Sequence, residues 1–201
     1  MSTAAHDIMV LETTQGPVKI EMRPDLAPQH VARIKELVQS GFYDGIVFHR
    51  VIEGFMAQTG CPHGTGTGGS GVKLKAEFNT APHVRGTASM ARAQNPDSGD
   101  SQFFICFDDA RFLDRQYTVW GQVISGMENV DKIKRGEPVR DPDKIVKAYM
   151  EDTAAAAPAA SSHADESHQD EAEEKPAKKP AAKKTATKKP AAKKAAPKKK
   201  S

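Results

Sequence analysis

One run of the chain, FHRVIEGFMAQ at residues 48–58, sets a single cation among large apolar side chains. Its arginine, Arg50, ends a short apolar stretch, and the amide of Gln58 follows after a Glu-Gly turn. A guanidinium is permanently charged, rigid and rich in donors, so it suits a pocket better than a core. A lone arginine in a strand is more often structural and paired with an acid. The apolar neighbours favour instead a pocket that grips an apolar ring while Arg50 addresses an adjacent amide.

Four further blocks accompany this run: the GTGTGG loop at residues 64–69, SMARA at 89–93, SQFFIC at 101–106 and FLD at 112–114. Together, and in this order, the five blocks resemble the cyclophilin family of peptidyl-prolyl cis/trans isomerases, over about residues 8–150. The resemblance implies an enzyme that rotates X–Pro bonds in proline-containing polypeptides and so assists protein folding, without a cofactor. Unaided rotation is slow, because amide resonance imposes a barrier of about 20 kcal/mol.

The resemblance also implies a role for each residue of the site. Arg50 would be the catalytic group, donating to the prolyl carbonyl and, as the amide twists, toward the prolyl nitrogen. Gln58 would hold Arg50 or the substrate backbone. The other implied substrate-binding residues are Phe55, Met56, Phe104 and Leu113 around the proline ring, Ala91 and Arg92 along the extended peptide through their backbone, Gln102 in the same cleft, and Phe112 and Tyr117 at its far wall.

Three of these positions depart from the better-known eukaryotic pattern of the family. Phe112 stands where those members carry Trp, Tyr117 where they carry His, and Arg92 where they carry Asn. All three look like the bacterial branch of the family. The arginine and the pocket are unchanged, so we expect weakened cyclosporin binding and an altered peptide preference with the reaction intact.

Other chemistries find weaker support in the sequence. Cys61, His63 and His83 are residue types that bind metal ions, but one cysteine with scattered histidines lacks a second close pair of ligands. The loop at residues 64–71 lacks the Gly-Lys-Ser/Thr ending of a phosphate-binding loop, which favours a surface loop. No nucleophile elbow accompanies the serines and acids. His49 is expected to be a buried, hydrogen-bonded histidine and not a catalytic base.

Hydrophobic periodicity predicts many short strands and two helices. Apolar residues recur at helical spacing from about Pro28 to Ser40, and Ser125 with Glu128 forms a capping box for a second short helix. Strands without βαβ alternation predict a closed antiparallel sheet. The resemblance implies a mainly β fold, a closed eight-stranded antiparallel β-barrel capped by two α-helices. The expected strands are residues 8–11, 18–22, 46–50, 55–59, 87–91, 103–107, 117–123 and 144–150.

Charge divides the chain into three parts. Residues 1–150 carry 17 Lys and Arg against 18 Asp and Glu, and they hold every aromatic residue. Residues 151–174 carry eight acids without Lys or Arg, and residues 175–201 carry 12 Lys without an acid. Segments that lack large apolar side chains cannot offset their ordering entropy by burial. We therefore predict an isomerase domain at 1–150, an acidic disordered linker at 151–174 and a basic disordered tail at 175–201.

From Ala177 the basic tail consists of five five-residue units, each with Lys at the second and third places, and it resembles the tails of linker histones. Lysine runs bind polyanions by releasing counterions, and a solvated tail that aids solubility is the other interpretation. The acidic residues 165–174 would compete for the lysines. The alternative function is thus a nucleoid- or RNA-associated chaperone that binds prolyl peptides and is localised by its tail.

The remaining features indicate an intracellular protein. Cys61 and Cys106 do not make a disulfide framework in a chain of 201 residues. The N-terminal residues lack the basic head and apolar run of a secretory signal. No stretch approaches the roughly 20 apolar residues that span a bilayer. We expect a cytoplasmic monomer without membrane contact.

Overall fold

The computed structural model describes residues 7–151. Eight strands form one antiparallel sheet in the order β3-β4-β6-β5-β7-β2-β1-β8. Two α-helices accompany the sheet, so the predicted mainly β class with two helices is confirmed. The elements are β1 (Ile8–Thr13), β2 (Gly16–Met22), α1 (Pro28–Gln39), β3 (Arg50–Ile52), β4 (Met56–Thr59), β5 (Thr87–Met90), the 3₁₀ turn η1 (Pro96–Ser98), β6 (Phe103–Cys106), the 3₁₀ turn η2 (Arg111–Leu113), β7 (Val119–Ser125), α2 (Met127–Asp131) and β8 (Ile145–Glu151).

The sheet curls into a half-barrel and does not close, so the predicted closed barrel is wrong. β3 and β8 stand at the two ends of the strand order and do not pair with each other. β3 has only three residues, and its outer edge is occupied by a loop, because Val51 and Gly136 exchange backbone hydrogen bonds of 2.9 and 2.8 Å. Covering an edge strand with a loop satisfies its backbone groups without closure.

The segment before Arg50 covers the other edge. Of the strand expected at 46–50, only Arg50 lies in a strand, so that expectation is wrong. Residues 45–48 instead run beside the start of β8, where the Gly45 N–H donates to the Ile145 carbonyl at 2.7 Å and the Phe48 N–H donates to Asp143 at 2.8 Å. The other seven predicted strands agree with the structure to within two residues at each end.

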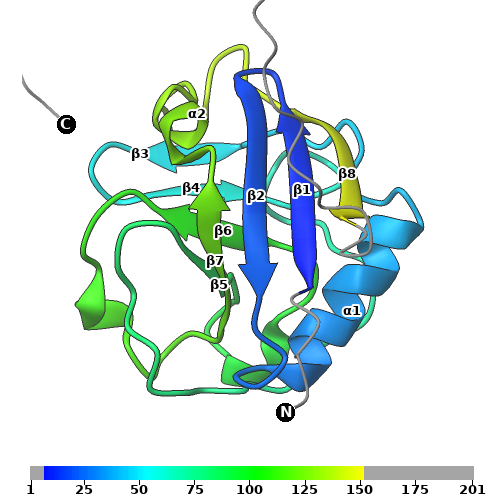
Figure 1. Cartoon of the computed structure of the whole chain (residues 1–201), viewed down its shortest axis with the longest axis vertical. Helices are drawn as coiled ribbons and strands as arrows, with labels where there is room; N and C mark the ends of the chain where they lie inside the picture. Colours follow the sequence, from blue (N-terminus) through cyan, green and yellow to red (C-terminus); the bar gives the residue numbers. More distant parts are fainter. Residues whose placement is uncertain (1–6, 152–201) are drawn as a thin grey trace, which may run out of the picture. The chain divides into compact units, whose positions relative to one another are not determined.

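The two helices cover different ends of the sheet. Figure 1 shows α1 beside β1 and β8, and α2 near the start of β2. Pro28 opens α1 as predicted, at a position where its missing N–H costs nothing. The buried face of α1 consists of His30, Val31, Ile34, Leu37 and Val38.

The predicted capping box of α2 is wrong. Ser125 ends β7, where it pairs with Lys19 of β2, and makes no side-chain cap. Gly126 is the N-cap residue and adopts a left-handed φ of 83°. A Cβ at this position would lie 2.1 Å from the Pro17 carbonyl oxygen. Only glycine combines that backbone angle with so close an approach, so the turn depends on Gly126.

The sheet buries a different set of side chains on each face, as strand alternation requires. On β6, Phe103 and Ile105 enter the main core with Trp120, which agrees with the interpretation of Phe103 as a core residue. Phe104 and Cys106 point to the other face. There a second apolar cluster forms from Met56, Phe104, Cys106 and Ala110, with Ile52, Phe55, Ala91, Leu113 and Tyr117 packed against it.

The predicted acidic linker and basic tail lie outside the described residues, apart from Glu151, which ends β8. Between residues 7 and 151, neither α-helix has the length and apolar character needed to cross a membrane.

Candidate active site

A cavity of about 640 Å³ opens over the second apolar cluster. Its lining combines apolar side chains with a few polar groups, the usual composition of a ligand site. Nine of the predicted site residues line it: Arg50, Phe55, Met56, Gln58, Ala91, Arg92, Phe104, Leu113 and Tyr117. The sequence-based reasoning did not assign His49, Thr65, Gly66, Glu137 and Pro138 to the site, although all five also line the cavity.

The strand register places the cation next to the apolar wall. Arg50 of β3 pairs with Gln58 of β4, and Gln58 pairs with Phe104 of β6. Directly paired residues share a face of the sheet, so the cation, the amide and the ring form one row across three strands. Met56 lies two residues before Gln58 and therefore on the same face.

Glu137 holds the guanidinium of Arg50. The Arg50 Nε donates to Glu137 Oε1 at 2.6 Å, and the two side chains are 39% and 57% exposed. Among residues 7–151 this is the one hydrogen bond recorded for the Arg50 side chain, and it leaves both Nη groups for another partner. Within residues 7–151 no hydrogen bond joins Gln58 to Arg50, and the Gln58 Nε2 donates to Gln102 Oε1 at 3.0 Å.

The glycine-rich loop forms part of the site and is not only a surface loop. Gln102 Nε2 donates to the carbonyl oxygens of Gly66 and Gly68 at 2.9 and 2.8 Å. The N–H groups of the same two glycines donate to the Cys61 sulfur at 3.2 and 3.3 Å. Gly66 has a φ of 86°, and a Cβ there would lie 3.3 Å from His49 Nε2. Glycine therefore lets the loop approach the cavity wall closely.

A second cavity, of about 220 Å³, adjoins the first and shares Gln58, Gly66, Ala91 and Arg92 with it. Gln102 and the buried carboxylate of Asp100 line only this second cavity. Asp100 accepts two hydrogen bonds of 2.6 Å from Ser70 and one of 3.2 Å from Lys73. Burial alone would raise the pKa of Asp100, but these donors outweigh it and lower the pKa. The second cavity therefore contains a buried, ionised carboxylate paired with the ammonium group of Lys73.

Arg92 lines both cavities. Its guanidinium donates to the Gln116 carbonyl at 2.9 and 2.8 Å and to the Ala93 carbonyl at 2.9 Å. The same group lies 4.6 Å from the centre of the Tyr117 ring, within cation–π range. The Ala91 N–H already donates to the Gln102 carbonyl, so it is not free to pair with a peptide.

His49 is buried beside Arg50, as expected, but its Nδ1 has no hydrogen-bond partner within residues 7–151. Burial, and then the positive charge of Arg50, lower the pKa of His49. The ring is therefore neutral at pH 7.

Comparison with known proteins identifies the fold and the reaction. Residues 8–151 match the family model described as cyclophilin type peptidyl-prolyl cis-trans isomerase/CLD. The chain belongs to this family. The probable peptidyl-prolyl cis-trans isomerase of Brucella suis is 54% identical over 163 residues, covering 73% of this chain and 83% of that protein. Peptidyl-prolyl cis-trans isomerase B of Bacillus subtilis is 44% identical over 126 residues, covering 62% of this chain and 87% of that protein.

Solved cyclophilins share the fold. AquaCyp293 from Hirschia baltica superposes with a TM-score of 0.67 at 33% identity, covering 75% of each chain. A cyclophilin-type isomerase from Cryptosporidium parvum, crystallised in the presence of the dipeptide Ala-Pro, gives a TM-score of 0.68 at 28% identity, covering 73% of this chain and 99% of that one. The protein is therefore a cyclophilin-type isomerase of prolyl peptide bonds.

Two further expectations for this cyclophilin concern residues outside the main cavity. Phe112 lines neither of the two cavities and is 66% exposed, with its ring centre 5.5 Å from that of Phe55. It therefore extends the apolar wall outward at the rim.

Within residues 7–151 no group of three or more His, Cys, Asp or Glu side chains is arranged to hold a metal ion, so Cys61, His63 and His83 do not form such a group.

Proposed function

We propose that Arg50 is the catalytic residue of the isomerase and that the proline ring of the substrate lies in the 640 Å³ cavity. The supporting observation is the row formed by Arg50, Gln58 and Phe104, which sets one held cation beside an apolar wall. A prolyl residue presents the matching pair of groups, an apolar ring and an adjacent amide.

The reaction needs only differential binding. Rotation about the C–N bond destroys amide resonance, so the prolyl nitrogen regains its lone pair in the twisted state. A donor near that nitrogen stabilises the twisted amide more than the planar one, which lowers the barrier. Glu137 holds Nε of Arg50, and the two Nη groups address the prolyl carbonyl and nitrogen.

The apolar residues position the ring for this step. Phe55, Met56, Phe104 and Leu113 surround the proline, and Tyr117 closes the inner wall. The Gln102 amide is occupied by Gln58, Gly66 and Gly68, so the remaining amide groups of Gln58 are the ones that contact the substrate backbone. The dipeptide named with the Cryptosporidium structure, Ala-Pro, is the kind of ligand that this arrangement would take.

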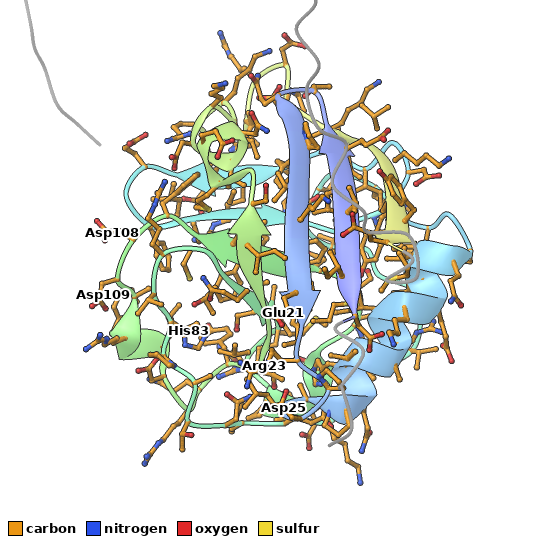
Figure 2. All side chains as sticks on the ribbon, in the orientation of Figure 1. Glu21, Arg23, Asp25, His83, Asp108 and Asp109 are labelled. Carbon is orange, nitrogen blue, oxygen red and sulfur yellow. The ribbon has the colours of Figure 1, made fainter. Side chains whose placement is uncertain are left out.

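The test compares full-length chains that carry single arginine substitutions. Arg50→Ala should lower kcat/KM on a prolyl peptide by about 100-fold or more, the usual loss when one oriented donor is removed from a transition state. Arg23→Ala is the matched control, because Arg23 is similarly exposed at 43% and also bonds one carboxylate, that of Asp25. Figure 2 shows this pair near the end of β2. Near-normal turnover in a folded Arg50→Ala protein would remove Arg50 from the mechanism.

A second function rests on the sequence of the tail. The Lys pairs that repeat every five residues from Ala177 favour binding to nucleic acid or another polyanion, which would localise the isomerase to that polyanion. Binding should lack sequence preference, because no aromatic side chain interrupts the lysines to stack on bases.

Gel-shift assays on DNA and RNA at about 50 and 200 mM salt test this second function. The full chain should bind less tightly at the higher salt concentration. Deleting residues 175–201 should abolish binding, whereas deleting the acidic residues 165–174 should strengthen it. Binding that is independent of salt, or that survives loss of the lysines, would contradict the electrostatic role.

A further inference from the structure

The imidazole of His83 lies beneath the proposed proline site, although His83 itself lines neither cavity. The side chain is fully buried. Figure 2 shows it on the inner side of the loop whose Asp108 and Asp109 project outward. Its ring stacks on that of Phe104, with centres 6.2 Å apart and an angle of 20° between the planes. The edge of Tyr117 meets the ring at 6.5 Å.

Both ring nitrogens of His83 have partners. Nδ1 lies 2.9 Å from Asp114 Oδ1, which also accepts the His83 backbone N–H at 2.7 Å. Nε2 lies 2.9 Å from the hydroxyl of Ser89 on β5. Burial lowers the pKa of His83 against the opposing effect of Asp114. The Nδ1 proton is donated to the carboxylate, and Nε2 faces the Ser89 hydroxyl, whose single proton also has the Thr118 carbonyl as an acceptor at 3.0 Å.

The residue types Ser, His and Asp match those of a hydrolytic triad, but this row cannot act as one. Ser89 is fully buried, so no substrate carbonyl reaches its hydroxyl. Asp114 instead follows Leu113, the last residue of η2, and its carboxylate ties that turn to His83. One imidazole thus contacts Phe104 of β6 and fixes the turn that carries Leu113.

We propose that His83 is a positioning residue of the isomerase, whose ring sets the separation between Phe104 and Leu113 on two sides of the proline. This inference rests on the proposed placement of proline in the main cavity. Arg50 is on β3, two strands from Phe104, and within residues 7–151 no hydrogen bond or ring contact joins it to His83 or Asp114. Loss of His83 should therefore weaken substrate binding and leave turnover of bound substrate nearly unchanged.

Steady-state kinetics on an Ala-Pro peptide, with the full chain, give the test. His83→Gln loses the ring and the Asp114 bond, so KM should rise about fivefold or more, on the scale of one lost aromatic pair, with kcat within about twofold of the wild-type value. A purely structural defect would instead reduce the active fraction, which lowers apparent kcat and leaves KM unchanged. A KM within about twofold of wild type in a folded His83→Gln protein would overturn the proposal.

His30 supplies the matched control. It is also buried, and its Nδ1 lies 2.6 Å from the carboxylate of Glu77, but it belongs to the buried face of α1 and, within residues 7–151, has no ring contact with Phe104 or Tyr117. His30→Gln should lose stability in urea unfolding and keep the wild-type KM. An equal rise in KM for the two histidine variants would contradict a role specific to His83.

Asp114 keeps the proposal testable even where His83→Gln does not fold, because its side chain is 32% exposed. Asp114→Ala removes the acceptor and should raise KM. Asp114→Asn retains Oδ1 as an acceptor and should restore a near wild-type KM. Equal KM values in these two variants would overturn the proposal.

Phe104→Ala separates this inference from the proposed function. If Phe104→Ala leaves KM unchanged, the proline does not lie in the cavity and both proposals fail. If Phe104→Ala raises KM while the His83 and Asp114 variants do not, only the positioning role of His83 fails.

Discussion

Truncation of Glu137 should lower isomerase activity modestly with little effect on stability. The Nε–Oε1 contact of 2.6 Å joins two side chains that are 39% and 57% exposed. Exposed ion pairs contribute about 0.2–1 kcal/mol, so Glu137→Ala should change the free energy of unfolding by no more than that. If the pair contributes the same energy to holding Arg50 in place, kcat/KM should fall about 1.4-fold to fivefold.

The assay is kcat/KM for a prolyl peptide, measured alongside urea unfolding of each protein. Glu137→Gln keeps an oxygen acceptor and should lie between Glu137→Ala and the wild type. The matched control is Asp131→Ala, because Asp131 pairs with Arg85 at similar exposures of 39% and 49% but lines neither cavity. Unchanged or increased activity in Glu137→Ala would refute the reasoning, since Glu137 would then not orient Arg50.

Two further predictions concern the cavity rim and pH. Phe112→Trp adds an N–H donor and contact area at the rim, so cyclosporin-type inhibition should strengthen while peptide turnover changes little. Unchanged inhibition together with lost turnover would show that this segment is wrongly assigned. Burial lowers the pKa of His30, His49 and His83, so the unfolded chain takes up protons below about pH 6.5 before the folded protein does. The urea midpoint should therefore fall between pH 7.5 and 5.5, and a constant or rising midpoint would contradict this.

Much of the site could be predicted because its residues lie in the short sequence blocks that carry the resemblance to the cyclophilins, and strand alternation agrees with their placement. Phe103 and Phe104 are adjacent in their strand, and successive residues of a strand point to opposite faces of the sheet. The same period sets Met56 and Gln58 on one side of β4. These residues lie in short runs whose register is fixed by core burial on the opposite face, so the blocks that carry the family resemblance also place the site residues on one face.

The features that could not be predicted depend on distant contacts. Glu137 comes 87 residues after Arg50, in a loop with no periodic pattern, and nothing in its neighbours marks it as the partner. The open edge of the sheet depends on Gly136 reaching Val51. The false capping box arose because Ser125 and Glu128 have the right spacing, but β7 pairing keeps Ser125 in the strand.

The central claim is that the Arg50 guanidinium stabilises the twisted amide. Arg50→Lys keeps the charge but loses the rigid fork of donors, so it tests this claim most directly when binding and turnover are measured separately. NMR exchange on a saturating Ala-Pro peptide gives the rate of the bound step, and titration gives Kd. We predict a bound-state rate lower by about tenfold or more, by analogy with the loss of an oriented donor, with Kd nearly unchanged. An unchanged bound-state rate with a raised Kd would show that Arg50 only binds the substrate, and would contradict the account.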